Sequence, residues 1–271
     1  MPAHRIILLT GNGLRHRWFA QRLARELNVV AVLGEAKSAA ITSTAELSSD
    51  DASVVAKHFA ERDAVEKKLL GDVPGFPTKD VQEIPFGTLN SLEIFDWVRQ
   101  REPDYLVLYG SGILKAPLLE YYDGRVINLH LGLSPYYRGS GTNFWPFVNG
   151  EPECVGGTIH LAVLKVDAGA ILGQVRPAPE ASDRIHEMGT KTIMAAGDAM
   201  PGIISLYAAG GMQPQKQDLT GGRLYRTRDF NAESARVAWR NLDAGLMRDY
   251  VANVSERQEK FPVVQLPRQR T

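Results

Sequence analysis

Short, continuous apolar runs alternate with amphipathic stretches along most of the chain. The runs at 6–9 (IILL) and 105–109 (YLVLY) are typical of parallel strands that are covered on both faces. Between them, apolar residues recur at helical spacing in 14–27 and 52–70, which predicts helices. The alternation of strands and helices predicts an α/β fold with a doubly wound, mostly parallel, Rossmann-like sheet. Further strands are expected at 29–33, 81–84, 126–130, 158–161 and 171–175.

The pattern changes after residue 210. The helical spacing of 185–209 is expected to be interrupted at Pro201. Beyond it, 223–230 alternates basic and apolar residues like an exposed strand, and 232–251 has helical spacing. We therefore predict two units along the chain, a core domain over 1–210 and a small C-terminal α+β appendage over 211–271.

Composition and charge narrow the classes of function. The 271 residues include 31 Lys and Arg and 31 Asp and Glu, so the formal net charge is zero. A neutral chain does not suit a protein that grips nucleic acid or an anionic membrane, so we expect neither partner. The single cysteine, Cys154, excludes a disulfide within the chain and fits a reducing, cytoplasmic location. The four apolar residues after Arg5 are too few for a signal peptide or a membrane span.

A polar triplet is expected to gather at the end of one strand. Alternate side chains of a strand share a face, so Asn128 and His130 lie side by side at the end of 126–130. Asp167, in a Gly-bearing turn between two apolar runs, can reach the same place. An amide donates to a developing oxyanion, an imidazole relays a proton near neutral pH, and a carboxylate holds the imidazole. These groups suit acyl transfer to an amine that the substrate supplies.

Other interpretations of these residues are open at this point. A single Asn or His at a strand end is more often a satisfied structural group, and an Asp beside Gly is often turn chemistry. His130, His160 and Asp167 form an alternative set of metal ligands, but His160 lies within a strand and is expected to pack, so we predict no metal. The turn at 11–13 lacks the third glycine of a dinucleotide fingerprint, whose place holds His16, which disfavours NAD.

The stretch 126–174 resembles the 10-formyltetrahydrofolate-dependent formyltransferases. That family carries an Asn-x-His pair at a strand end, a loop of the form SLLP-x-x-(R/K)-G, and an Asp in a D-x-G turn further on. Here the pair is at 128–130 (NLH), the loop at 131–139 (LGLSPYYRG) and the turn at 167–169 (DAG), and weaker similarity extends over about 5–210. The loop departs from the best-known members at Gly132 and Ser134 and agrees at Pro135, Arg138 and Gly139.

The resemblance implies a Rossmann-like formyltransferase core over 1–210 and a set of site residues. It makes Asn128, His130 and Asp167 the catalytic residues. The donor 10-formyltetrahydrofolate is expected to place its pterin ring beside Asp167, against the turn formed by Gly112, Ile113 and Leu114. The acceptor is expected at the first turn of the chain and at the motif loop, where the candidate residues are Asn12, Arg15, His16, Pro135, Arg138 and Gly139.

The identity of the acceptor separates related activities. The loop variant and the short, helical C-terminal segment resemble sugar N-formyltransferases, which implies a nucleotide-linked amino sugar used for surface polysaccharides. Glycinamide ribonucleotide, a siderophore hydroxylamine and methionyl-tRNA are alternative acceptors, although the C-terminal segment is too short and helical for the barrel domain of methionyl-tRNA formyltransferases. A formyltetrahydrofolate hydrolase and a non-catalytic nucleotide-sugar binding module are the other classes. The sequence does not determine the oligomeric state, and a homodimer is one possible assembly.

Overall fold

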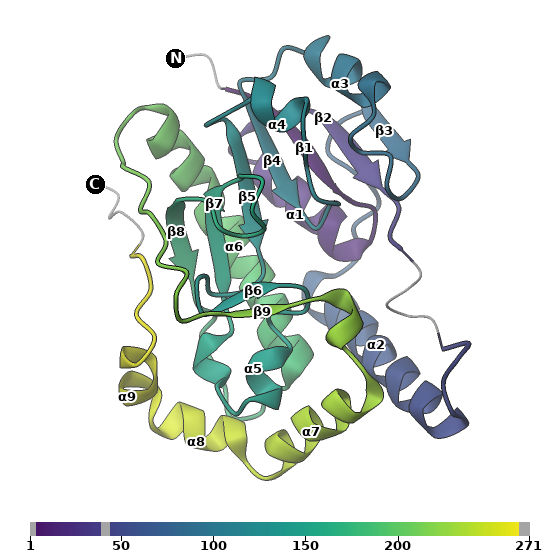
Figure 1. Ribbon diagram of the computed structural model, residues 1–271, viewed down its shortest axis with the longest axis vertical. Coiled ribbons are helices and arrows are strands. Elements are labelled where there is room, and N and C mark those ends of the chain that lie inside the picture. The colour runs from purple at the N-terminus through teal and green to yellow at the C-terminus, as the bar shows by residue number, and fades with distance from the viewer. Residues whose placement is uncertain (1–3, 39–43, 266–271) are drawn as a thin grey trace.

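A seven-stranded sheet runs through the molecule (Figure 1). The computed structural model describes residues 4–38 and 44–265. The first residues of the predicted unit 1–210 and the last residues of the predicted unit 211–271 therefore lie outside the described residues. The strand order is β3-β2-β1-β4-β5-β7-β8. The strands of this sheet are β1 (Arg5–Gly11), β2 (Asn28–Glu35), β3 (Val81–Ile84), β4 (Tyr105–Tyr109), β5 (Val126–His130), β7 (Gly157–Leu161) and β8 (Ile171–Val175).

The sheet is mostly parallel, as predicted. Strands β1 to β5 pair in parallel, whereas β7 runs antiparallel to both β5 and β8. The carboxyl ends of β1, β2, β4 and β5 therefore meet at the same edge of the sheet. Open α/β sheets bind their ligands in the crevice beyond such ends. Asn128 and His130 lie at the end of β5, and most of the other candidate residues follow β1, β4 or β5, whereas Asp167 comes from the turn between β7 and β8.

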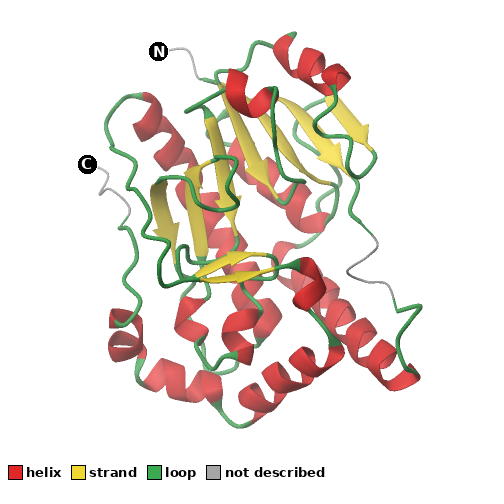
Figure 2. Cartoon of the chain, in the orientation of Figure 1, coloured by secondary structure: helices red, strands yellow, loops and turns green. Residues whose placement is uncertain are grey.

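Helices cover both faces of the sheet, which confirms the doubly wound prediction (Figure 2). Ile6 and Leu8 of β1 pack with helices α1 and α6, whereas Ile7 and Leu9 pack with α3 and α4 on the opposite face. Successive strand residues point to opposite faces, so a strand that is buried on both sides is apolar throughout. The helices are α1 (Leu14–Ala24), α2 (Ser49–Leu70), α3 (Leu92–Arg99), α4 (Leu118–Tyr121), α5 (Trp145–Val148), α6 (Ile185–Ala208), α7 (Ala232–Asp243), α8 (Leu246–Ala252) and α9 (Val254–Glu259).

A third apolar cluster joins the C-terminal segment to the preceding chain. Tyr137 and Phe147 are fully buried in it, together with Ala235 of α7 and Tyr250 of α8. Cys154 is also buried there as a free thiol, and burial raises the pKa of this thiol. The segment that was predicted as an appendage thus shares a core with residues that precede it.

The C-terminal segment also covers the outer edge of β8. Ile171 and Gln215 exchange two backbone hydrogen bonds of 2.7 and 2.8 Å, and the Gln174 N–H donates to the Val264 carbonyl at 3.2 Å. An uncovered edge strand presents unpaired N–H and C=O groups, which makes it prone to pair with another chain. The turn and tail that follow α6 satisfy these groups within the molecule.

A second sheet of two short strands crosses the molecule near the end of β5 (Figure 1). Strand β6 (Tyr137–Gly139) pairs in parallel with β9 (Arg223–Tyr225). The sequence analysis treated residues 137–139 as part of a loop and missed β6. Three residues are too few for alternation to be recognised, and this strand forms through its pairing with a segment far along the chain.

Three predictions about single elements were wrong. Pro201 does not interrupt α6, because the residues around it are buried against the sheet and the packing outweighs one lost backbone hydrogen bond. The strand predicted at 223–230 is limited to β9, and a 3-10 helix, η3 (Thr227–Asp229), follows it. The helix predicted at 232–251 is divided into α7 and α8, because Gly245 has a φ of 97° and ends the helical path.

Among the described residues, we find no helix that is long and apolar enough to span a membrane.

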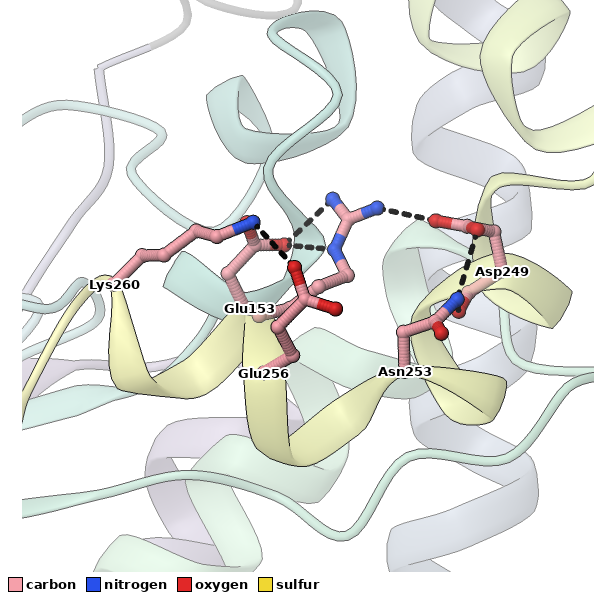
Figure 3. A pocket seen from close by; sticks show the side chains of 6 residues that line it. Glu153, Asp249, Asn253, Glu256 and Lys260 are labelled. Atoms are coloured by element: carbon pink, nitrogen blue, oxygen red, sulfur yellow. Dashed lines mark hydrogen bonds and ion pairs between the residues drawn. The ribbon is translucent and has the colours of Figure 1, made fainter.

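A polar hollow between α8, α9 and the 3-10 helix η2 (Pro152–Cys154) is filled by internal ion pairs. Arg257 donates to the buried Glu153 at 2.8 Å and to Asp249 at 2.5 Å. Figure 3 shows Lys260 reaching Glu256, and Asn253 reaching Asp249, in the same hollow. Because these charges are already paired, the hollow ties the C-terminal helices to the core and is a poor candidate for a substrate site.

Two histidines are buried side by side where α2 packs on α6. His58 and His186 have ring centroids 4.5 Å apart, and His58 also contacts the rings of Phe59, Phe144 and Phe230. Burial, with a smaller effect of Arg62, lowers the pKa of His58 from 6.5 to about 4. Burial and the neighbouring His58 lower the pKa of His186 to about 3. Both rings are therefore neutral in the native protein at neutral pH.

This pair predicts that the protein loses stability in mild acid. As the pH falls below 6.5, the unfolded chain takes up protons that the native rings bind only near pH 4 and 3. The free energy of unfolding should therefore be highest above pH 6.5 and fall by about 3 kcal/mol for His58 and about 5 kcal/mol for His186 as the pH approaches these values. Urea denaturation across this range should show a smaller loss for His58→Phe, whose new ring joins the surrounding phenylalanines. The variant His4→Phe, at an exposed site, is the matched control, and an unchanged acid slope in His58→Phe would contradict the prediction.

Candidate active site

Asn128 lies opposite His160 where β5 pairs with β7. The His160 Nδ1–H donates to the Leu161 carbonyl at 2.8 Å, which leaves Nε2 as the hydrogen-bond acceptor. The Asn128 Nδ2 group lies 3.0 Å from this Nε2 and donates to it. One N–H of the amide is thus used to fix its orientation, and the second N–H is left to donate to a substrate oxygen.

His130 ends β5 with its ring enclosed by protein acceptors. Its Nε2–H donates to the Tyr137 carbonyl at 3.0 Å, and its Nδ1 lies 3.3 Å from Oδ2 of Asp167. Gly132 is required beside the ring, because a Cβ at this position would lie 2.6 Å from Nε2 of His130 and 2.7 Å from Thr142. Burial lowers the pKa of His130, and the Asp167 carboxylate only partly offsets this effect. The resting ring is therefore neutral at neutral pH, yet both nitrogens face groups that stabilise a protonated ring.

Asp167 completes the cluster from the turn between β7 and β8. Its Oδ2 accepts the Gly139 N–H at 2.8 Å, and its Oδ1 lies 3.6 Å from Nε2 of His160. Its backbone has a φ of 49°, a left-handed conformation that Asp tolerates better than most residues. Burial opposes ionisation of the carboxyl, but the positive charge that His130 and His160 carry when protonated in acid, together with the Gly139 N–H, lowers the pKa of Asp167 to about 2. The carboxylate is thus ionised at any physiological pH.

The predicted convergence of Asn128, His130 and Asp167 is confirmed. An amide donor, a buried imidazole and an ionised carboxylate meet at the end of β5, and the hydrogen bonds described above hold each of them in place. Because both nitrogens of His130 face protein acceptors, the ring must exchange one of these contacts before it can donate to a substrate. Catalytic hydrogen bonds often tighten only when substrate is bound.

His160 takes a larger part in the cluster than the sequence predicted, and the contacts of β6 with the cluster were not predicted. His160 was expected to pack within its strand, but its ring contacts both Asn128 and Asp167. The signal that could have found it is antiparallel pairing, which places position 160 opposite position 128. Despite this gathering of histidines and a carboxylate, the part of the chain that the structure describes contains no group of three or more His, Cys, Asp or Glu side chains arranged to hold a metal ion.

The residues predicted for the acceptor at the first turn are only partly available. Asn12 is exposed beyond β1, where its carbonyl accepts Nη1 of Arg17 at 2.8 Å. Arg15 is not a free cation, because its guanidinium forms an ion pair with the buried Glu66 of α2. His16 is buried against Tyr109, with ring centroids 5.2 Å apart, and burial together with Lys37 lowers its pKa well below the usual value. The structure therefore does not support Arg15 or His16 as free positive charges for a phosphate.

The turn predicted for the pterin ring is also partly occupied. The Gly112 N–H donates to Oε2 of the buried Glu35 at 2.5 Å, so this backbone donor is already satisfied. Leu114 is 4% exposed and packs in the core between β4 and α4, which corrects its prediction as a wall of the donor site. Ile113 has 57% of its surface exposed. Of the three residues, it alone offers an apolar side chain to a ligand.

The loop at 131–139 contains residues that shape the backbone and one cation, Arg138, that has no partner among the described residues. The Gly139 N–H is used by Asp167, and the Pro135 carbonyl lies against Gly222. Arg138 is 7% exposed, and its guanidinium makes no hydrogen bond or ion pair with any residue that the structure describes. Its charge lies near enough to His130 to help lower the pKa of that ring. Arg138 therefore keeps its predicted capacity to bind a substrate, whereas Pro135 and Gly139 shape the loop.

Comparisons with known proteins match this chain to formyltransferases. The family model described as formyl transferase matches residues 5–204. Among solved structures, a sugar N-formyltransferase from Shewanella sp. is 16% identical with a TM-score of 0.55, and the match covers 88% of this chain and 87% of that one. Glycinamide ribonucleotide transformylase 1 from Symbiobacterium toebii is 19% identical with a TM-score of 0.53, covering 80% and 95%. A 4-N formyltransferase from Francisella tularensis is 15% identical with a TM-score of 0.54, covering 88% and 87%.

The structural likenesses are distant and show the fold, whereas the family model shows the enzyme class. It matches most of the sheet and includes the whole Asn128, His130 and Asp167 cluster. The chain therefore belongs to the formyl transferase family, whose enzymes transfer a formyl group from 10-formyltetrahydrofolate.

Proposed function

We propose that this enzyme formylates the primary amine of a small acceptor, a nucleotide-linked amino sugar. The observation that carries the chemistry is the convergence of Asn128, His130 and Asp167 at the end of β5. The acceptor is supported by the resemblance of the loop at 133–139 to the corresponding loop of sugar N-formyltransferases. An acceptor with a diphosphate also supplies an anion for the unpaired charge of Arg138.

In the proposed reaction, the neutral amine of the acceptor attacks the formyl carbon of the donor. The free N–H of the Asn128 amide stabilises the negative charge that develops on the formyl oxygen. His130 takes up the proton that the new ammonium group loses, and Asp167 stabilises the protonated ring. The proton then passes to the departing nitrogen of the folate as its bond to the formyl carbon breaks. The products are the N-formyl acceptor and tetrahydrofolate.

An acceptor screen tests this proposal. The purified enzyme is incubated with 10-formyltetrahydrofolate and with amino sugars linked to different nucleotides, glycinamide ribonucleotide, or no amine. Mass spectrometry should detect the gain of one CO unit on a nucleotide-linked amino sugar. Formylation of glycinamide ribonucleotide alone would replace the proposed acceptor without changing the enzyme class. Rapid donor consumption in the sample without amine would indicate a hydrolase.

Arg138, which has no partner among residues 4–38 and 44–265, predicts where the acceptor's anion binds. We expect Arg138→Met to raise the KM for the acceptor by about 10-fold or more, because a hydrogen bond to a charged group contributes about 1.5–3 kcal/mol. Removal of an unpaired buried charge should leave the unfolding temperature unchanged or higher, so the loss is not one of folding. Steady-state kinetics with each substrate varied in turn measure this effect. Arg228→Met, in the exposed η3, is the control, and an unchanged KM for the acceptor would contradict the prediction.

A further inference from the structure

The backbone of β6 touches both members of the buried acid–base pair. The Tyr137 carbonyl accepts a hydrogen bond from His130 at 3.0 Å, and the Gly139 N–H donates to Asp167 at 2.8 Å. Only one residue, Arg138, separates these two contacts along the strand. A movement of β6 therefore changes the position of His130 relative to Asp167, whose closest atoms are 3.3 Å apart.

The position of β6 is in turn fixed by β9. The backbone N–H of Arg223 donates to the Tyr136 carbonyl at 2.8 Å, and the N–H of Ser140 donates to the Tyr225 carbonyl at 2.9 Å. These bonds lie at the two ends of the short parallel pair. The pairing thus holds the strand on both sides of the two catalytic contacts.

Stacked side chains reinforce the pairing. The ring of Tyr225 stacks on Trp145 with centroids 4.3 Å apart and an interplanar angle of 6°, and it also stacks on Tyr137 at 6.0 Å. Asn149 donates to the hydroxyl groups of both tyrosines at 2.9 Å. Arg223 adds a bond of 2.9 Å to the Tyr137 hydroxyl. Offset aromatic stacking and these hydrogen bonds hold β9 against Tyr137 and Trp145.

Two glycines allow the strands to approach this closely. A Cβ on Gly139 would lie 2.0 Å from the Tyr225 carbonyl oxygen, and a Cβ on Gly222 would lie 1.7 Å from the Pro135 carbonyl oxygen. Either contact is with backbone, so the strands must separate if a side chain is added. By contrast, a Cβ on the neighbouring Gly221 would meet nothing within 4 Å.

Strand β9 lies beyond residue 204, where the match to the family model ends. We propose that the C-terminal segment is a positioning element of the active site, in which β9 holds β6 so that His130 and Asp167 are aligned for proton transfer. Residues 222–225 touch neither reacting group in this arrangement and act through the backbone of β6. The inference rests on the proposed roles of His130 and Asp167 and assigns a role to a segment that those roles leave unexplained.

Gly222→Ala, with Gly221→Ala as the matched control, tests the proposal. Neither glycine has a left-handed φ, so alanine is compatible with both backbones and only the contact of the new methyl group differs. We expect Gly222→Ala to lower kcat by about 10- to 100-fold, because small displacements of catalytic groups have effects of this size. The KM values and the rate with Gly221→Ala should stay near the wild-type values. Equal kcat in the two variants, or a loss confined to KM, would overturn the proposal.

A second measurement reads the alignment without any substrate. In protein labelled at histidine, we expect the ring signals of His130 and their titration midpoint to differ between Gly222→Ala and wild type and to be unchanged in Gly221→Ala. This result is independent of the acceptor, so it separates failure of the positioning role from failure of the proposed acceptor. A lower kcat with unchanged His130 signals would overturn the proposal.

A pair of side-chain variants keeps the test decisive if Gly222→Ala does not fold. Arg223→Met removes the bonds to Tyr137 and Glu151 while the strand glycines remain. Arg228→Met removes the same charge nearby, where the side chain is exposed. We expect a lower kcat and altered His130 signals only in Arg223→Met. If these two variants behave alike, β9 has no positioning role.

Discussion

Replacement of His130 or Asn128 with alanine is expected to lower kcat for formyl transfer by about 100- to 10,000-fold each, the usual range for a positioned acid–base group or oxyanion donor. His130→Ala removes the buried ring that Asp167 and the Tyr137 carbonyl prepare to hold a proton. Asn128→Ala removes the amide whose orientation His160 fixes. Both effects should appear in kcat, because both groups act on charges that form during the reaction.

Rapid-quench or steady-state rates with saturating donor and acceptor measure these losses. His4→Ala provides a control, since His4 lies on the surface before β1, far along the strand from the ligand-binding edge. Circular dichroism and unfolding temperature check that each variant is folded. Turnover within a few-fold of wild type in either active-site variant would remove the assigned role from that residue.

Asp167→Asn is expected to have an effect of similar size, about 100- to 10,000-fold on kcat, because an amide cannot stabilise a protonated imidazole as a carboxylate does. The substitution keeps an oxygen that can accept the Gly139 N–H, so the turn should keep its shape. The pKa of Asp167 is about 2, so the wild-type rate should show no ionisation of this carboxyl in the neutral range. The remaining activity should therefore report on the histidine alone.

The dependence of the rate on pH gives a second expected result for Asp167→Asn. The Asp167 carboxylate raises the pKa of His130, so its removal should lower that pKa further. If the neutral ring accepts the proton of the attacking amine, the rate falls as the pH drops through the pKa of His130. This acidic limb should move to lower pH in Asp167→Asn and stay in place in Asp123→Asn, an exposed control before β5. A limb that moves to higher pH would contradict the assigned interaction.

The sheet could be predicted from the sequence because its strands are buried on both faces. Residues 6–9 and 105–109 are apolar at nearly every position, and a run of this kind suits few structures other than a covered parallel strand. The interiors of the helices could also be predicted, from the helical spacing of their apolar residues. The predicted break at Pro201 was wrong because packing of α6 outweighs the tendency of proline to end a helix. The end of α7 was missed because the left-handed backbone of Gly245, and not the spacing of apolar residues, decides where the helical path ends.

The sequence also predicted one aspect of the candidate site, its residue types, and did not predict another, the availability of each group. The reactive residue types were visible in the strand and in the Asp-Ala-Gly turn, and their order along the chain was the basis of the resemblance to formyltransferases. The availability of each group was not visible. Arg15 forms an ion pair with Glu66, the Gly112 N–H donates to Glu35, and Leu114 lies in the core. Each of these partners comes from a distant segment, and no local pattern predicts such a pairing.

The sequence by itself determined the doubly wound sheet and the three kinds of candidate catalytic group, because periodic apolar burial and side-chain chemistry are properties of short segments. Only the tertiary structure decided that His160 orients Asn128, that Arg138 is buried without a partner among the described residues, and that β9 pairs with β6 beside the candidate site. These features depend on contacts between segments tens of residues apart. Such contacts form only when the whole chain has packed, because the free energy that stabilises them comes from the shared core.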